Sequence, residues 1–105
     1  MAWIVLIVAG LFEVAWASLL ESTKGFTRLW PTVGFLVTLA ISMYLLSVAT
    51  RSIPVGTGYA VWVGIGAVGA FLVGVFVKGD DTSAGQVAAI VALVASIIAV
   101  KLTAA

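Results

Sequence analysis

The sequence predicts an all-α membrane protein in which one chain forms four transmembrane helices. Of its 105 residues, 64% are hydrophobic and 9% are charged, whereas soluble domains are about 45–50% apolar and about 25% charged. The apolar residues form four long runs, each close to the roughly 20 residues that a helix needs to cross a bilayer. These runs are apolar on both faces, which argues against the alternating strands of a membrane β-barrel.

Polar and charged residues mark the ends of the four runs and define a single transmembrane domain over 1–105. The first run ends before the polar stretch 21–28, and the second ends at Arg51. The third ends at 78–81, and Lys101 lies near the end of the fourth. The predicted helices cover about 2–20, 30–50, 54–77 and 84–104.

Helix-terminus signals agree with these boundaries. Gly25 and Gly79 each follow a lysine, a pattern typical of a helix that closes with a left-handed glycine. Pro31 and Pro54 stand where the second and third helices should begin, a position at which the missing N–H costs little. Residues 81–83 (Asp, Thr and Ser) offer N-caps for the fourth helix.

The composition excludes several classes of protein. The chain has no Cys and no His, so disulfides, iron–sulfur clusters, imidazole bases and ordinary structural zinc are ruled out. We therefore expect no metal and no cofactor. A net charge of +1 gives no long-range attraction to nucleic acid. An enzyme is the least expected class, because nothing resembles a nucleophile–base pair.

The charged residues are nearly balanced across the membrane. If the helices alternate direction, Lys24, Arg28 and Lys78 share one face, while Arg51 and Lys101 share the other. This difference is too small for the positive-inside rule to fix an orientation. Either other factors orient the chain, or both orientations insert and allow an antiparallel dimer.

Glu13 is the one ionisable acid or base that lies well inside a predicted span. It is within about two residues, or about 3 Å, of the centre of the first helix. A charge at this depth costs on the order of 3 kcal/mol. The carboxyl group either joins helices through a hydrogen bond or binds a proton or cation. The second interpretation is favoured because no Lys or Arg lies well inside a span, where it could neutralise the acid.

Aromatic and hydroxyl side chains recur at helical spacing in the same spans. Trp16 is three residues after Glu13, and Tyr59 and Trp62 are three apart in the third helix. In the second helix, Ser42 lies four residues after a threonine, although such hydroxyls often bond their own backbone. Aromatic faces attract cations, and a carboxylate can bind a planar guanidinium through two parallel hydrogen bonds. Together these residues predict a cation-binding pocket.

Small residues predict close helix contacts. Gly66, Ala70 and Gly74 form one stripe at four-residue spacing, and residues 88, 92 and 96 (Ala, Ala and Ser) form another on the fourth helix. Gly64 and Gly66 also mark a natural place for a bend. The fourth helix is interpreted as an assembly element, with packing inside one bundle as the alternative.

Three segments carry a resemblance to a known family: 10–17 (GLFEVAWA), 25–31 (GFTRLWP) and 53–66 (IPVGTGYAVWVGIG). In this order they resemble the small multidrug resistance family of proton-coupled exporters over essentially the whole chain. The tryptophan at position 16 resembles the guanidinium-exporter branch of this family, because multidrug members usually have glycine at this position.

The resemblance implies an antiparallel homodimer in the inner or plasma membrane of a prokaryote. Glu13 from both subunits would bind a guanidinium-type cation or protons in competition. The other residues that match pocket positions are Trp16, Ser42, Tyr59 and Trp62. By the same resemblance, Ser42 and Trp62 would hydrogen-bond the acid, and Tyr59 would be a mobile gate residue.

Three alternative functions remain, and they differ in the role of Glu13. A multidrug exporter would take quaternary ammonium and aromatic cations, although the Trp16 ring should narrow its pocket. The loop 78–86 departs from the family pattern, so the chain is alternatively one subunit of a heterodimeric exporter. In a non-transporting accessory subunit, Glu13 would only join helices.

Overall fold

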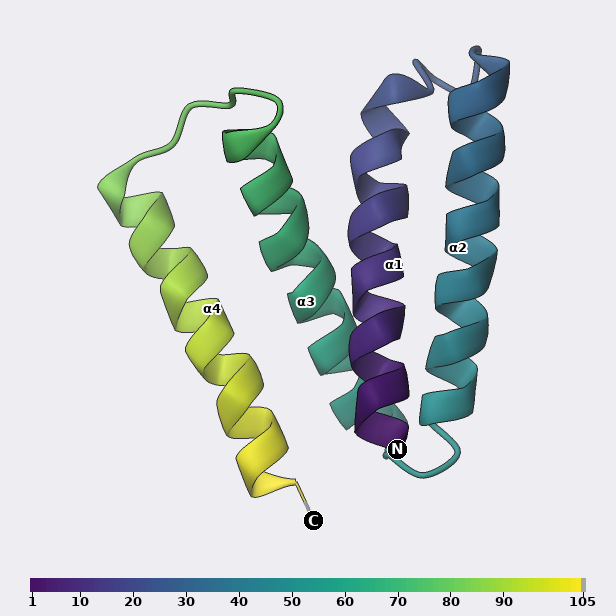
Figure 1. Ribbon diagram of the computed structural model, residues 1–105. Coiled ribbons are helices and arrows are strands. Elements are labelled where there is room, and N and C mark those ends of the chain that lie inside the picture. Colours follow the sequence, from purple (N-terminus) through teal and green to yellow (C-terminus); the bar gives the residue numbers. More distant parts are fainter. Residues whose placement is uncertain (105) are drawn as a thin grey trace.

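The computed structural model describes residues 1–104 and consists of four helices (Figure 1). Each helix is long and apolar enough to cross a membrane, which confirms the predicted all-α, four-helix fold. Ala105, the last position of the predicted domain, lies outside the described residues. The helices are α1 (Ala2–Ser22), α2 (Leu29–Ala49), α3 (Val55–Phe76) and α4 (Ala84–Thr103).

The expected left-handed glycines lie in the loops after α1 and α3, two residues beyond the right-handed C-caps Thr23 and Val77. Gly25 has a φ of 72° and Gly79 a φ of 75°, conformations that a residue without a Cβ adopts freely. Lys24 and Phe26 are also left-handed, with φ of 48° and 65°. The left-handed conformation is unfavourable for Lys24 and Phe26, because each carries a Cβ. The α1–α2 loop therefore holds local backbone strain.

The starts of the helices follow the sequence signals with small shifts. Pro31 is the third residue of α2 rather than its first, and Pro54 is the N-cap of α3. Ser83 is the N-cap of α4, and its Oγ accepts a hydrogen bond of 3.1 Å from the Gln86 N–H.

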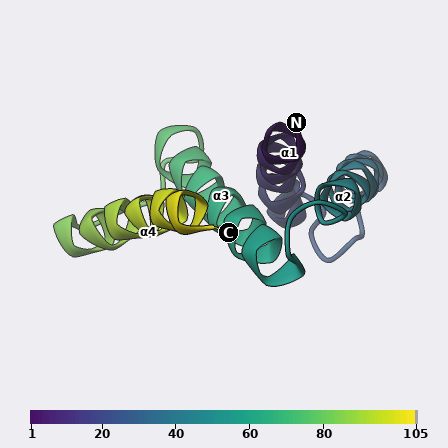
Figure 2. The same ribbon diagram turned by 90° about the horizontal axis from the view of Figure 1, so that it is seen from below.

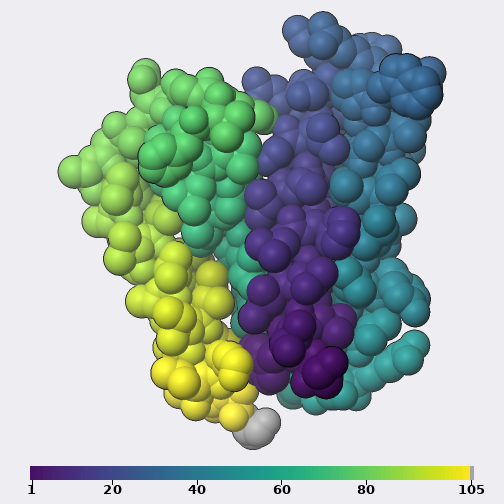
Figure 3. Space-filling model, in the orientation of Figure 1, coloured from purple at the N-terminus to yellow at the C-terminus, as the bar shows by residue number. Residues whose placement is uncertain are grey.

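The helices form a thin layer with α1 near its centre. α1 packs along both α2 and α3, while the backbone of α4 lies close only to that of α3. Figure 1 and Figure 2 show the resulting arrangement, in which α4 extends outward on the side away from α2. The molecule measures 43 × 35 × 17 Å. Figure 3 shows α4 along one edge of this layer, and none of its residues is buried.

Glycines on both helices allow α1 and α3 to approach closely. A Cβ at Gly10 would collide with Ile65, and a Cβ at Gly69 would collide with Val14. In a membrane, where lipid is as apolar as the side chains, such close packing is a main source of helix association.

The predicted stripe on α3 serves more than one contact. Gly66 faces α1, whereas Gly74 faces Asp80 in the following loop. Gly64 faces Ile97 of α4. The predicted bend is not a helix break, because α3 continues without interruption through this region.

Replacing Gly69 with alanine is expected to destabilise the α1–α3 contact. The added Cβ would overlap Val14, and overpacking of this kind costs about 1–3 kcal/mol. The matched control is Gly56→Ala, whose Cβ meets nothing within 4 Å. We expect the control to be neutral or slightly stabilising when unfolding is measured in detergent. Equal stability of the two variants would contradict the contact.

Candidate functional site

Glu13 lies on the buried face of α1, beside α3. This face also carries Leu6, Ala9 and Gly10. The Glu13 side chain is 9% exposed, and its carboxyl group lies directly against Gly66, where a Cβ would collide with it. The absence of a side chain at position 66 therefore provides the space that the carboxyl group occupies.

The Glu13 carboxyl group has no polar partner within the described chain. Its Oε2 atom is buried and accepts no hydrogen bond among residues 1–104. Among residues 1–104, the ion pair joins Lys78 Nζ to Glu21 Oε2 at 3.5 Å and does not involve Glu13. A buried carboxylate without a partner is strongly unfavourable.

A hydrogen-bond chain links the three helices next to the acid. The Trp62 Nε1–H donates to Ser42 Oγ at 2.9 Å, and the Ser42 hydroxyl donates to the Ala9 carbonyl at 2.7 Å. Trp62 is 5% exposed and Ser42 is fully buried. Because Ala9 lies one turn before Glu13, this chain fixes α2 and α3 against the part of α1 that carries the acid.

These bonds differ from the pattern that the resemblance implied. Ser42 and Trp62 were expected to hydrogen-bond Glu13, but both bond elsewhere in this structure. The Ser42 hydroxyl has one hydrogen, and the backbone carbonyl of Ala9 takes it. Thr38 differs from Ser42, since its hydroxyl bonds the Gly34 carbonyl of its own helix at 2.8 Å.

The predicted aromatic residues lie in one connected series. The ring centroids of Trp16 and Trp62 are 6.5 Å apart, and those of Trp62 and Tyr59 are 5.5 Å apart. Trp16 Nε1 is buried without a hydrogen-bond partner among the described residues. Tyr59, at the end of the series, is 54% exposed. Ring faces in this arrangement can attract a cation.

Phe35 is a part of the site that the sequence reasoning missed. Its ring is 8% exposed and meets Trp16 edge-on, with centroids 5.7 Å apart and planes at 86°. On its other side it contacts Phe26, at 5.4 Å between centroids. Phe35 lies seven residues before Ser42, a spacing that places both on one helical face. That periodicity is the signal that could have identified it.

Replacing Ser42 with alanine is expected to lower the stability of the protein by about 1–3 kcal/mol, because the buried Trp62 N–H would lose its acceptor. The matched control is Ser96→Ala, since Ser96 is exposed and bonds only the Ala92 carbonyl of its own helix. We expect the control to change stability by less than about 0.5 kcal/mol. Unfolding followed by tryptophan emission measures both, and equal effects would contradict a role for the Ser42–Trp62 bond.

The similarity to known proteins extends over nearly the whole chain. The profile of the family described as "Small Multidrug Resistance protein" matches residues 1–100. A "Guanidinium exporter" of Salmonella typhimurium (strain LT2) is 47% identical over 104 residues, which cover 99% of each chain. Proteins of the same name from Citrobacter freundii and Yersinia pseudotuberculosis are 48% and 46% identical, with at least 97% of each chain covered. The chain therefore belongs to the small multidrug resistance family.

Proposed function

We propose that this protein is a proton-coupled antiporter that exports guanidinium or small guanidinyl cations, with Glu13 as the group that binds either cargo or proton. The observation that carries the proposal is the buried carboxyl group without a polar partner. The proposal is further supported by relatives that are named guanidinium exporters and match nearly the full chain.

The family membership indicates where this chemistry takes place and which class of protein carries it out. The family consists of transporters rather than enzymes. The four membrane-spanning helices and the exporter family make the chain a multi-pass protein of the prokaryotic inner membrane. In this setting, a cation that reaches Glu13 must leave water and find its compensating charge in the protein.

A guanidinium ion suits the groups gathered near Glu13. It is planar and stays charged at neutral pH, and its parallel N–H groups can bind both oxygens of one carboxylate. The rings of Trp16 and Trp62 would face the cation, with cation–π attraction of about 0.5–2 kcal/mol. The Trp62–Ser42–Ala9 bonds would hold one wall of the site in place.

Coupling to protons follows from competition for one acid. A protonated Glu13 has no charge with which to hold a cation, and a bound cation excludes the proton. If only occupied carriers change sides, outward movement of the cation is tied to inward movement of protons. Tyr59, which is half exposed at the end of the aromatic series, would then act as the gate residue.

We further propose that two copies of the chain form an antiparallel dimer. The five basic residues are nearly balanced across the membrane, which permits both orientations. α4 buries none of its residues within the chain, although it carries the small-residue stripe suited to close helix contact. Both copies of Glu13 would then belong to one site.

Replacing Glu13 with glutamine is expected to abolish exchange and leave the fold intact, because the amide is uncharged and similar in shape. The measurement is proton movement driven by a guanidinium gradient in vesicles that contain the purified protein alone. We expect the rate to fall to that of protein-free vesicles. The matched control is Glu21→Gln, whose side chain is 82% exposed and which should keep wild-type rates.

The pH dependence of binding gives the same test a second readout. Guanidinium binding to the wild type should weaken as the pH falls, by up to about tenfold per pH unit for each proton displaced. Glu13→Gln should show no such dependence. Retained, pH-dependent exchange in Glu13→Gln would refute the proposed role of the acid.

Replacing Trp16 with glycine is expected to change which cations are accepted. Loss of the ring removes about 0.5–2 kcal/mol of attraction for guanidinium and opens space beside Phe35, so a tetraphenyl cation should bind more tightly. The control is Trp30→Gly, because Trp30 is 77% exposed. Competition binding of the two cations measures the change. Wild-type protein that prefers the tetraphenyl cation would favour the multidrug alternative.

A further inference from the structure

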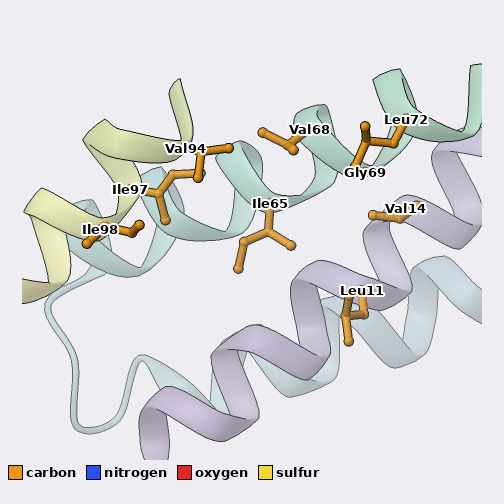
Figure 4. A pocket seen from close by; sticks show the side chains of 9 residues that line it. All are labelled: Leu11, Val14, Ile65, Val68, Gly69, Leu72, Val94, Ile97 and Ile98. Carbon is orange, nitrogen blue, oxygen red and sulfur yellow. The ribbon is translucent and has the colours of Figure 1, made fainter. Parts of the chain in front are cut away.

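A groove separate from the Glu13 site runs along the face where α1, α3 and α4 meet. Its two halves have volumes of about 310 Å³ and about 320 Å³, and they share Ile65, Ile97 and Ile98. Figure 4 shows the first half, with side chains from all three helices around it. We call the combined space the α4 groove. None of the five predicted site residues lines it.

The α4 groove is apolar except at one end, where Lys101 lies. The Lys101 ammonium is 5.0 Å from the centroid of the Trp3 ring, and both residues line this end. Trp3 is in the first turn of α1 and Lys101 in the last turn of α4, so this end lies at a membrane–water interface. Lys101 forms no ion pair within residues 1–104.

The length of the α4 groove matches one leaflet of a bilayer. Its lining on α3 extends from Val61 to Leu72, and 11 residues of helix span about 16 Å. Half of a hydrocarbon core of about 30 Å is about 15 Å. One acyl chain that begins at the interface beside Lys101 would therefore reach the far end of the groove.

The groove face of α4 differs from the face that is suited to another helix. At about 100° per residue, Val94, Ile98 and Lys101 point about 150° away from the stripe of small residues at 88, 92 and 96. The partly buried residues of α4, among them Leu93 and Ile97, face α3. A dimer that uses the small residues would leave the α4 groove open to lipid.

We propose that the α4 groove binds an anionic phospholipid, with one acyl chain along α1, α3 and α4 and the headgroup phosphate on Lys101. The cation at one end provides the charge complementarity, and the apolar lining provides the space for the chain. This assignment does not depend on the transported cation. A second copy of the chain is the competing occupant.

The test compares two lipids with the same acyl chains, dioleoylphosphatidylglycerol and dioleoylphosphatidylcholine, bound to purified full-length protein in detergent. Native mass spectrometry counts the lipids retained per chain. We expect about a fivefold preference for the glycerol headgroup, the factor that one lysine contributes at an anionic lipid surface. Lys101→Gln should abolish this preference, whereas Arg51→Gln, a cation on the same membrane face outside the groove, should retain it.

A second variant tests the position of the acyl chain. Ile98→Trp should fill the groove and reduce retention of both lipids severalfold. The control is Ile4→Trp, because Ile4 and Ile98 are similarly exposed, at 58% and 55%, and Ile4 does not line the groove. Circular dichroism verifies that each variant is helical.

Three results would overturn the assignment. In the first, Lys101→Gln keeps the headgroup preference. In the second, Ile98→Trp retains both lipids at wild-type levels while remaining helical. In the third, Ile98→Trp converts a dimer to a monomer in detergent, which would identify a second copy as the occupant. Loss of guanidinium transport in Glu13→Gln bears on none of these outcomes, so the two proposals are tested separately.

Discussion

The contact between the Glu13 carboxyl group and the backbone at Gly66 is the constraint on which the rest of the arrangement depends. It places an acid in a helix interface that is otherwise built from glycines, aliphatic side chains and the paired rings of Trp16 and Trp62. No donor in the described chain bonds its buried oxygen. The same contact ties the position of the acid to the packing of α1 on α3.

The polar residues around this acid divide the structural and chemical roles between them. The Trp62 N–H donates to the Ser42 hydroxyl, and the Ser42 hydroxyl donates to the Ala9 carbonyl. They thereby hold three helices together without using the Glu13 carboxyl group. The groups that bond across the three helices are therefore distinct from the buried carboxyl group.

The fold and much of the site could be predicted from the sequence, because they rest on local signals. Run lengths and loop charges located the helices, and the isolation of Glu13 identified the acid. The partner of Ser42 could not be predicted, because its bond to Ala9 spans 33 residues and depends on how α1 and α2 pack. For the same reason, the sequence indicated Gly66 as a packing or bending residue but not as the residue that contacts the Glu13 carboxyl group. Phe35 had a usable helical spacing, yet its apolar side chain gave no sign of the ring beside it.

The ring contacts form one series that runs from the α1–α2 loop to the start of α3. They extend from Phe26, in the loop between α1 and α2, through Phe35, Trp16 and Trp62 to Tyr59, in the first turns of α3. These two termini lie near opposite surfaces of the bilayer, because α1 and α3 start at the same side and the loop follows the other end of α1. Each ring packs on the next, so the positions of aromatic side chains near the two membrane surfaces are linked through one continuous series of contacts.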